Sequence, residues 1–428
     1  MKYNVLVLGS GGREHALCWK LSQSPFMGDL HCIPGNAGIQ EIATIHTEPD
    51  ILNFSALEAF CKKNNIQLIV VGKELPLVQG IKDYFADTNI LVFGPSRHAA
   101  MLEGSKIYTK NLLTKYNIPT AAYHTFFNKD DALYHLESIA KYPVVVKADG
   151  LAQGKGVVIV YTKEEAISSI LDMMEHKKYK QAGEKIIVEE YLEGREVSYQ
   201  MIVHGDQYFE CIPTQDYKKA LEGNQGPNTG GMGSIAPAPW INEEILDNIQ
   251  KDIVVPLMNA LYVENNPFSG ILFLGLMVNA KNQPSVLEIN VRFGDPESQV
   301  LLPLLETDLL PLMIDIAQDK KIDSYSLNWK TNTHATCVVL TSKGYPESYS
   351  KGYPIHGLKN VSQEENCVCF HAGTKMDGDS VITDGGRVLN IVGIGKNLAD
   401  STKKAYEIAE NISFEGKTSR SDIGKLIE

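Results

Sequence analysis

The sequence predicts a multidomain protein that combines an α/β part with α+β parts. The chain has 428 residues, which suggests about three domains at roughly 150 residues each. About the first hundred residues alternate short apolar strands with helices, whereas beyond about residue 104 strands follow one another through loops. The first pattern is typical of α/β domains and the second of α+β domains. We expect domains over 1–103, 104–328 and 329–428.

The N-terminal domain is expected to hold a Rossmann-like parallel sheet covered by helices. Its strands are fully apolar runs bounded by Gly or Pro, as strands buried on both faces are. They fall at 5–8, 31–33, 68–71 and 90–93, with helices over 13–21 and 55–63.

The rest of the chain is predicted to contain strand–loop–strand units and helices. In the central region we expect strands at 143–147, 157–160, 186–190, 197–203, 208–213, 271–278 and 286–292, with helices near 105–116, 164–175, 243–263 and 298–318. In a small C-terminal mixed α/β domain we expect strands at 334–340, 367–371 and 386–393, and a helix near 400–411.

Composition narrows the class of protein. The net charge is -12 and 43% of residues are hydrophobic, so an acidic globular protein is expected and nucleic acid or an anionic membrane is not a predicted partner. No apolar run is long enough to span a bilayer and no signal peptide is visible, which predicts a cytoplasmic protein. The seven cysteines lack zinc-ligand spacing and are expected to be buried thiols.

The first glycine-rich loop, Gly9–Ala16, lies between a predicted strand and a predicted helix. Small residues there let a phosphate approach the free N–H groups of a helix N-terminus. A dinucleotide site would also need an acid after the second strand, and Ile33–Gly38 has none. A monophosphate site shared with the 34–38 loop is the preferred interpretation, and a tight turn without ligand is the alternative.

A second glycine-rich segment, Val144–Val158, is predicted as strand, loop and strand. It is not a Walker A loop, because Gly156 follows Lys155 where Ser or Thr is required. Backbone N–H groups of such a flap can cover a triphosphate, and Lys147 can reach phosphate as a point charge. The alternative is a mobile hairpin with solvated lysines.

The segment Val286–Glu297 is the most informative. Alternate residues of a strand share a face, so Glu288, Asn290 and Arg292 should lie together, where polar groups are costly unless they meet a ligand. Carboxylate and amide oxygens suit Mg²⁺ that bridges phosphates, and an adjacent Arg can stabilise a phosphoryl group in transfer. A solvent-facing strand with a salt bridge is the alternative. The opposite, apolar face would be formed by Leu287, Ile289 and Val291.

Three further segments are ambiguous on their own. Ile187–Ser198 could bind an adenine edge and a ribose, or it could be an acid-rich solvated turn. Thr214–Lys219 mixes charges, and Gln225–Gly233 is rich in glycine with Met232 as its apolar anchor. A loop of the last kind is either disordered or wrapped on a ligand.

In this order, the motifs resemble those of ATP-grasp ligases, and specifically the glycinamide ribonucleotide synthetase family. The resemblance covers essentially the whole chain and implies ATP-grasp domains in the central region, with a small lid subdomain over about 124–194. The most specific segments are Gly9–Leu17, Pro34–Gly38, Leu102–Lys106, Lys147–Gly156, Gly226–Gly233 and Arg292–Glu297, the last being the family's signature.

The resemblance implies a site for ATP with Mg²⁺ or Mn²⁺. Lys106 and Lys147 resemble the lysines that hold ATP phosphates, and the loop with Gly154 and Gly156 resembles the flap over them. The adenine segment is matched by Glu189, Tyr191 and Leu192, the ribose carboxylate by Glu196, and the metal ligands by Glu288 and Asn290.

It also implies two substrate sides. The 5-phosphoribosylamine side is matched by Gly11, Gly12, Asn36, Gly38, Glu74, Asn228, Thr229 and Gly230, and the glycine side by Asp216, Arg292, Gly294, Asp295, Pro296 and Glu297. The catalytic residues implied are Arg292, Lys147 and Asp216.

The implied reaction joins glycine to 5-phosphoribosylamine through glycyl phosphate, giving glycinamide ribonucleotide, ADP and phosphate in de novo purine biosynthesis. A monomer without nucleic-acid or membrane partners is expected. Another ATP-grasp ligase, such as a biotin-type carboxylase, would share the ATP residues. A nucleotide-binding regulatory protein would not need Glu288, Asn290 and Arg292 together.

Two loops depart from the family pattern. The family usually reads Asp-His-Lys-Arg where this chain has Asp216–Lys219, and Gly-Pro-Glu-Ala-Pro-Leu where it has Gly72–Leu77. Because Arg and Lys are not interchangeable at a bidentate site, these changes bear on substrate contacts. They leave the ATP and metal positions unchanged.

Overall fold

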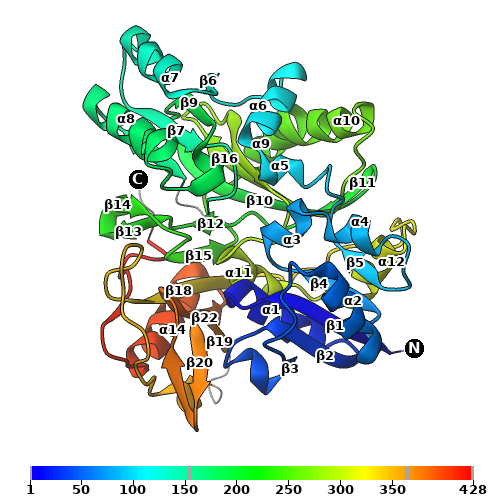
Figure 1. The fold of residues 1–428 in the computed structure, drawn as a ribbon. Helices are drawn as coiled ribbons and strands as arrows, with labels where there is room; N and C mark the ends of the chain where they lie inside the picture. The colour runs from blue at the N-terminus through cyan, green and yellow to red at the C-terminus, as the bar shows by residue number, and fades with distance from the viewer. Residues whose placement is uncertain (1, 153–155, 362–365, 426–428) are drawn as a thin grey trace.

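The computed structural model describes residues 2–152, 156–361 and 366–425. Its N-terminal part, blue in Figure 1, is an all-parallel sheet in the order β3-β2-β1-β4-β5. The strands are β1 (Tyr3–Gly9), β2 (Met27–Pro34), β3 (Thr44–Ile45), β4 (Leu68–Val71) and β5 (Leu91–Phe93). The helices are α1 (Gly12–Ser22), α2 (Phe54–Lys63), α3 (Glu74–Val78) and α4 (Ile81–Phe85). The predicted Rossmann-like parallel sheet is confirmed.

Burial on both faces explains why these strands are continuously apolar. Leu6 and Leu8 of β1 pack in one hydrophobic core, and Val5 and Val7 pack in another on the opposite face of the sheet. Since alternate residues of a strand point to opposite faces, a strand covered on both sides has no position left for a polar residue.

A four-stranded antiparallel sheet forms a separate layer in the order β6-β9-β7-β8 (Figure 1). Its strands are β6 (Tyr123–Phe126), β7 (Val144–Ala148), β8 (Val157–Val160) and β9 (Ile186–Glu190), with helices α7 (Lys129–His135) and α8 (Lys163–Ile170). This layer has its own hydrophobic core, built from residues between Ala132 and Val188. We call it the lid sheet.

The central sheet is also antiparallel, in the order β11-β10-β16-β17. It consists of β10 (Arg195–His204), β11 (Gln207–Glu210), β16 (Ser269–Val278) and β17 (Pro284–Asn290). Helices α5 (Met101–Gly104), α6 (Lys106–Lys115), α9 (Glu243–Ile249) and α10 (Val255–Val263) belong to the same region, and a π-helical turn over Gln250–Val254 joins the last two.

The C-terminal sheet mixes strands from distant parts of the chain. Its order is β12-β15-β18-β22-β19, and β23 also pairs with β18. The strands are β12 (Gln215–Asp216), β15 (Gly233–Ala236), β18 (His334–Ser342), β19 (Cys367–His371), β22 (Arg387–Gly395) and β23 (Lys417–Thr418). Helix α14 (Leu398–Asn411) packs on β22 and β18. Two hairpins lie beside this sheet, β13 (Lys219–Leu221) with β14 (Gln225–Asn228), and β20 (Thr374–Asp377) with β21 (Ser380–Thr383).

Except for the lid sheet, the layers share hydrophobic cores. Leu6 of β1 belongs to the same core as Val203 of β10 and Leu272 of β16. A second core joins Val5 of β1 to residues of β16 and β18. The N-terminal sheet, the central sheet and the C-terminal sheet are therefore packed against one another through buried apolar side chains.

Two predicted segments differ from the structure. The helix expected over 298–318 is two helices, α11 (Glu297–Leu304) and α12 (Leu309–Ala317), because Asp308 caps a new start by accepting a hydrogen bond from the Leu310 N–H. The glycine-rich segment 225–233 is partly a strand, since β14 pairs with β13. The spacing of apolar residues along the sequence shows neither the helix cap nor the strand pairing.

Within the described ranges, no helix is long and apolar enough to cross a membrane. The cysteines follow the expected burial: Cys18, Cys32, Cys61, Cys211 and Cys337 are buried, and the remaining two are half-buried.

Gly270 in β16 marks a close contact between the central sheet and the N-terminal sheet. Its φ is +127°, and a Cβ atom there would lie 3.1 Å from the Gly94 Cα. Gly270→Ala should lower the free energy of unfolding by about 1–3 kcal/mol, because a side chain is strained at this φ. Urea denaturation measures the change, with Ser285→Ala on the adjacent strand as control; equal midpoints for both variants would contradict the prediction.

Candidate active site

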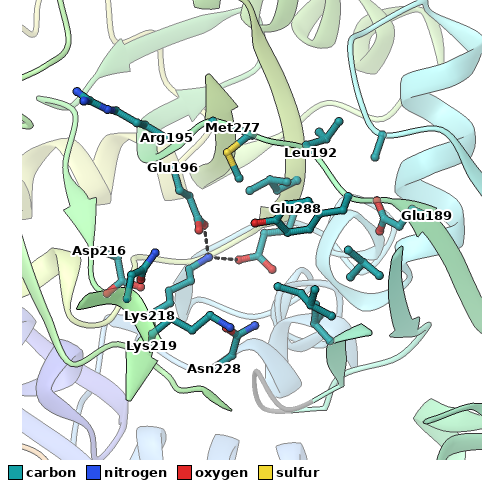
Figure 2. Close-up of a pocket in the computed structure, with 18 of the residues that line it drawn as sticks. Glu189, Leu192, Arg195, Glu196, Asp216, Lys218, Lys219, Asn228, Met277 and Glu288 are labelled. Atoms are coloured by element: carbon teal, nitrogen blue, oxygen red, sulfur yellow. Dashed lines mark hydrogen bonds and ion pairs between the residues drawn. The ribbon is translucent and has the colours of Figure 1, made fainter. Parts of the chain in front are cut away.

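A cavity of about 280 Å³ opens between the lid sheet and the central sheet (Figure 2). Its apolar lining includes Val145, Val157, Ile159, Met277 and Leu287, and its charged lining includes Lys147, Glu189, Glu196, Lys218 and Glu288. Apolar walls with a few placed charges are usual for small-molecule sites. Among the predicted ATP residues, Tyr191 and Leu192 also line this cavity.

Glu189 is a buried carboxylate held between two lysines. Its carboxylate pairs with Lys147 at 2.5 Å and with Lys110 at 2.6 Å, and all three side chains are less than a tenth exposed. Lys147 and Glu189 share a face because β7 and β9 are antiparallel neighbours. A buried charge without a partner would be expensive, so Glu189 fixes both ammonium groups at the cavity wall. Lys110 was missed in the sequence, although it follows Lys106 by one helical turn.

Lys106 is the first residue of α6 and lies beside the loop that follows β7. Asp149 accepts hydrogen bonds from the Ser105 hydroxyl and the Ile107 N–H, and Lys106 Nζ donates to the Gly150 carbonyl at 3.2 Å. Burial lowers the pKa of Lys106, and Glu288 opposes that shift. Gly156 closes the described part of this loop through its carbonyl, which accepts from the Ala148 N–H, whereas Gly154 lies outside the described residues.

Lys218 lies between two carboxylates at the centre of the cavity. Its ammonium pairs with Glu196 of β10 and, at 3.2 Å, with Glu288 of β17 (Figure 2). Lys218 lowers the pKa of Glu288, and burial raises it. Together with Lys147, Lys218 outweighs burial and brings the pKa of Glu288 to about 2. Burial alone would lower the pKa of Lys218, but Glu196 and Glu288 raise it well above its ordinary value. Lys218 was not among the predicted site residues.

The strand that carries Glu288 has a bulge, and this corrects one prediction. Leu276 of β16 pairs with Val286, but Gly275 pairs with Glu288, so Leu287 is an extra residue in β17. Leu287 therefore does not share the apolar face expected from strict alternation. It lines the cavity beside Glu288, while Val286 takes the core position.

Glu288 and Asn290 are the residues that could hold a divalent cation. Glu288 remains ionised at neutral pH, and the amide oxygen of Asn290 now accepts a hydrogen bond from Arg292 at 3.0 Å. Carboxylate and amide oxygens fit Mg²⁺ or Mn²⁺. Among the described residues, no three acidic, His or Cys side chains form a cluster that could hold a metal, and phosphate or water oxygens are suitable further ligands.

Arg292 lies just beyond β17 in a second group of charges. It pairs with Glu103 at 3.0 Å and donates to the Phe293 carbonyl, while its buried Nε has no partner. Burial raises the pKa of Glu103, although Arg292 opposes it. Glu74 lies within electrostatic reach of Arg292 and Arg13, which together outweigh the effect of burial and lower its pKa. The Nε is therefore a buried donor that is left unsatisfied.

Half-buried Asp216 and buried Glu297 lie within electrostatic reach of each other, next to this arginine. Burial raises the pKa of both groups, and Glu297 raises that of Asp216 further. Ser198 donates a hydrogen bond to Glu297 at 2.8 Å, but Asp216 Oδ1 is buried without a partner, as is Gln200 Nε2. Unsatisfied buried polar atoms cost free energy, and a bound cationic group would satisfy the two carboxylates.

Asp295 connects the second group to the C-terminal sheet. Arg387 of β22 pairs with its carboxylate at 3.4 Å and donates to the carbonyls of Asp295 and Gly230. Burial would raise the pKa of Asp295, but Arg387 and Arg13 lower it. Gly294 is held by Gln200, and the Pro296 carbonyl accepts from Ser234. Arg387 was not predicted, because nothing near residue 387 signals a site.

The N-terminal loop residues lie outside the cavity. The Gly11 N–H donates to Glu14 at 2.6 Å, and the Asn36 side-chain amide donates to the carbonyls of Ser10 and His371. The predicted residues Gly12 and Gly38 pack closely against side chains, Gly12 against Asn390 and Gln299, and Gly38 against His15 and His371. Of the other loop, Asn228 lines the cavity and Thr229 donates to the Lys218 carbonyl.

Three family models match almost the whole chain. They are described as phosphoribosylglycinamide synthetase, N domain over 3–103, ATP-grasp (A) domain over 104–298, and C domain over 335–426.

Two curated relatives are similar over nearly their whole length. The chain is 43% identical to the phosphoribosylamine–glycine ligase of Rhodopirellula baltica, covering 99% of this chain and 97% of that protein. It is 44% identical to the protein of the same name from Caldanaerobacter subterraneus, covering 98% and 99%.

Solved structures agree with this similarity. The crystal structure of phosphoribosylamine–glycine ligase from Thermotoga maritima has a TM-score of 0.84 at 33% identity and covers 98% of this chain and 100% of that one. The biotin carboxylase from Campylobacter jejuni, in complex with an ATP analogue, has a TM-score of 0.73 at 15% identity and covers 98% and 93%, which shows a shared fold alone.

Glu189→Gln should destabilise the protein by about 3 kcal/mol, because two buried lysines lose the charge that compensates them. Urea unfolding measures this. The matched control is Glu190→Gln, one position along the same strand with an exposed side chain. Equal urea midpoints for the two variants would show that Glu189 does not hold the two lysines in place.

Glu297→Gln should reduce the pH dependence of stability. The folded protein holds protons on the Asp216–Glu297 pair above their ordinary pKa values of 3.8 and 4.5. The unfolded chain binds fewer protons there, so the pair contributes free energy of unfolding that is present below the ordinary pKa values and is lost as pH rises through the folded ones. Urea unfolding at about pH 5 and about pH 8 should show that the variant lacks part of this loss relative to wild type. The exposed Glu415→Gln should keep the wild-type slope; identical slopes in all three proteins would exclude a protonated pair.

Proposed function

The chain belongs to the phosphoribosylglycinamide synthetase family and is an ATP-dependent ligase of purine biosynthesis, and we propose that its cavity is where ATP binds. The ligase joins glycine to 5-phosphoribosylamine and produces glycinamide ribonucleotide, ADP and phosphate. One observation carries the assignment of the cavity: Lys147, Glu196 and Glu288 converge there from three different strands. These are the charges that triphosphate, ribose and a metal ion require.

In this proposal the apolar wall holds the adenine. Tyr191 and Leu192 leave β9 at the cavity edge, and Met277 and Leu287 lie on the other side of the lining. Glu196 takes the ribose hydroxyls, and Lys106 and Lys147 neutralise the phosphates as point charges. Glu189 has a supporting role, because its carboxylate is already engaged by Lys110 and Lys147.

Glu288 and Asn290 are the proposed protein ligands of Mg²⁺ or Mn²⁺. When bound, the ion would neutralise charge on the transferring phosphoryl group. The loop with Gly154 and Gly156 would exclude water above the phosphates and so protect a reactive product.

The glycine side is proposed to be the second group of charges. Asp216 and Glu297 would meet the glycine ammonium, since a cation offsets their mutual repulsion. The glycine carboxylate oxygen then attacks the γ-phosphorus, the bond to the β,γ-bridging oxygen breaks, and ADP leaves. Arg292 would hold the resulting glycyl phosphate through its free Nε.

The 5-phosphoribosylamine side is proposed to lie next to it. Its amine attacks the acyl carbon of glycyl phosphate, a C–N bond forms, phosphate leaves and the amine loses a proton. Asn228, Thr229 and Gly230 would contact this substrate, and Arg387 supports the adjacency of the two sides because it binds the carbonyls of Gly230 and Asp295. Further proposed contacts are Gly11, Gly12, Asn36, Gly38 and Glu74, with Gly294, Asp295 and Pro296 on the glycine side.

The division into 1–103, 104–328 and 329–428, with a lid over about 124–194, also remains a proposal. The separate core of the lid sheet supports it. We further propose that the protein acts as a monomer in the cytoplasm.

The test is ADP release by the purified protein with ATP and Mg²⁺, adding glycine and freshly generated 5-phosphoribosylamine separately and together. Sustained ADP release over many turnovers should appear only when both are present. Arg292→Lys should lower kcat about 100-fold, because a lysine cannot replace a guanidinium donor held in this geometry. The exposed Lys320→Ala, beyond α12, should leave kcat unchanged. ADP formation without either substrate, or none at all, would overturn the assignment.

A further inference from the structure

The C-terminal segment 420–425 docks on the loop that carries Lys218. Tyr217 Oη donates a hydrogen bond to the Lys425 carbonyl at 2.9 Å and accepts one from the Gly424 N–H at 3.1 Å. The Tyr217 ring is only 2% exposed, and the Arg420 guanidinium lies 5.2 Å from its centroid. One side chain of the site loop is therefore enclosed by the end of the chain.

Arg420 ties the backbone of the same loop. Its guanidinium donates to the Lys219 carbonyl at 2.9 Å and forms a two-point pair with Asp422, at 2.7 Å for each nitrogen. Asp422 in turn accepts from the Gly223 N–H at 2.9 Å. Arg420 is 1% exposed. A bidentate pair has one narrow geometry, so it holds the loop beyond Tyr217, at Lys219 and Gly223, in one place.

Helix α14 anchors the segment from behind. Tyr406 Oη donates to the Arg420 carbonyl and accepts from the Ile423 N–H, both at 2.9 Å. The segment thus bridges a helix of the C-terminal sheet to the cavity loop, and both hydrogen bonds of the Tyr406 hydroxyl go to the segment.

Lys218 is the residue placed by these contacts. Its neighbours Tyr217 and Lys219 are both held by the C-terminal segment, and its own carbonyl accepts from the Thr229 N–H and hydroxyl at 2.8 Å each. Side chains alternate along an extended backbone, so Tyr217 faces the segment while Lys218 enters the cavity between Glu196 and Glu288 (Figure 2). The backbone from which the lysine extends is fixed at three successive residues.

We propose that Tyr217 is a positioning residue, through which the C-terminal segment 420–425 sets Lys218 in the ATP cavity. The inference rests on the proposed function of that cavity. It also gives a structural reason for one departure from the family pattern, because the hydroxyl of Tyr217 is what contacts the Gly424 and Lys425 backbone. Lys218 places Glu196, the proposed ribose carboxylate, and Glu288, so loosening the segment weakens ATP binding more than it slows the chemical step.

The main experiment compares steady-state kinetics of the full chain and Tyr217→Phe. This change keeps the ring and its contact with Arg420 and removes two hydrogen bonds. KM for ATP should rise about tenfold while kcat falls less than about threefold and KM for glycine is unchanged. Tyr84→Phe, which removes an exposed tyrosine hydroxyl bonded to Glu58, should change none of these constants.

Two further variants separate positioning from general support of the fold. Tyr406→Phe should raise KM for ATP in the same way, because the hydroxyl of Tyr406 bonds to the segment. In a Lys218→Met background, Tyr217→Phe should have no further effect on KM for ATP, because the residue through which it acts is gone. If Tyr217→Phe does not fold, Tyr406→Phe decides by the same readings.

The outcomes are distinguishable from failure of the proposed function. Wild-type protein without substrate-dependent ADP release would sink the proposed function itself. An active wild type with an unchanged KM for ATP in both tyrosine variants, or the same tenfold rise in the Lys218→Met background, would overturn only the positioning role. A lower melting temperature with unchanged KM would assign the segment to stability alone.

Discussion

The pairing of one ammonium with two carboxylates organises the ligand cavity. Glu196 and Glu288 come from different strands of the central sheet, and their like charges would repel across the cavity. Lys218 lies between the two carboxylates and offsets that repulsion. If triphosphate and a divalent cation bind there as proposed, the same three side chains would exchange partners with them.

Similar compensation recurs around the site, and in each case the partners come from separate parts of the chain. Glu189 of the lid sheet holds Lys110 of α6, and Asp295 is held by Arg387 of the C-terminal sheet. Arg292 reaches back to Glu103 at the end of α5. The geometry of the site therefore depends on how the sheets are packed, and the shared cores of β1, β16 and β18 keep that packing in place.

The sequence predicted those features of the structure that depend on interactions between residues close in the chain. Continuous apolar runs predicted the parallel strands, and Lys147 and Glu288 were found at strand positions that face the cavity. Alternation failed at Leu287, because a bulge depends on pairing with β16 and leaves no mark in the periodicity of β17. Lys218 and Arg387 were missed since their partners are distant in the sequence, as Asp295 is from Arg387. In the Gly11 loop, the glycine spacing did not show that the Gly11 N–H donates to Glu14.

The C-terminal sheet has a consequence for recombining this protein with its relatives. Strand β18 lies between β22 and β15, and β15 comes from residues about a hundred positions earlier in the chain. A chimaera that exchanged only residues 329–428 would pair the β18 of one protein with the β15 of another. A poor fit between these two strands would leave an open strand edge, which is prone to aggregation. The segments that should be exchanged together are not continuous in the sequence: they are 215–236 and the C-terminal residues.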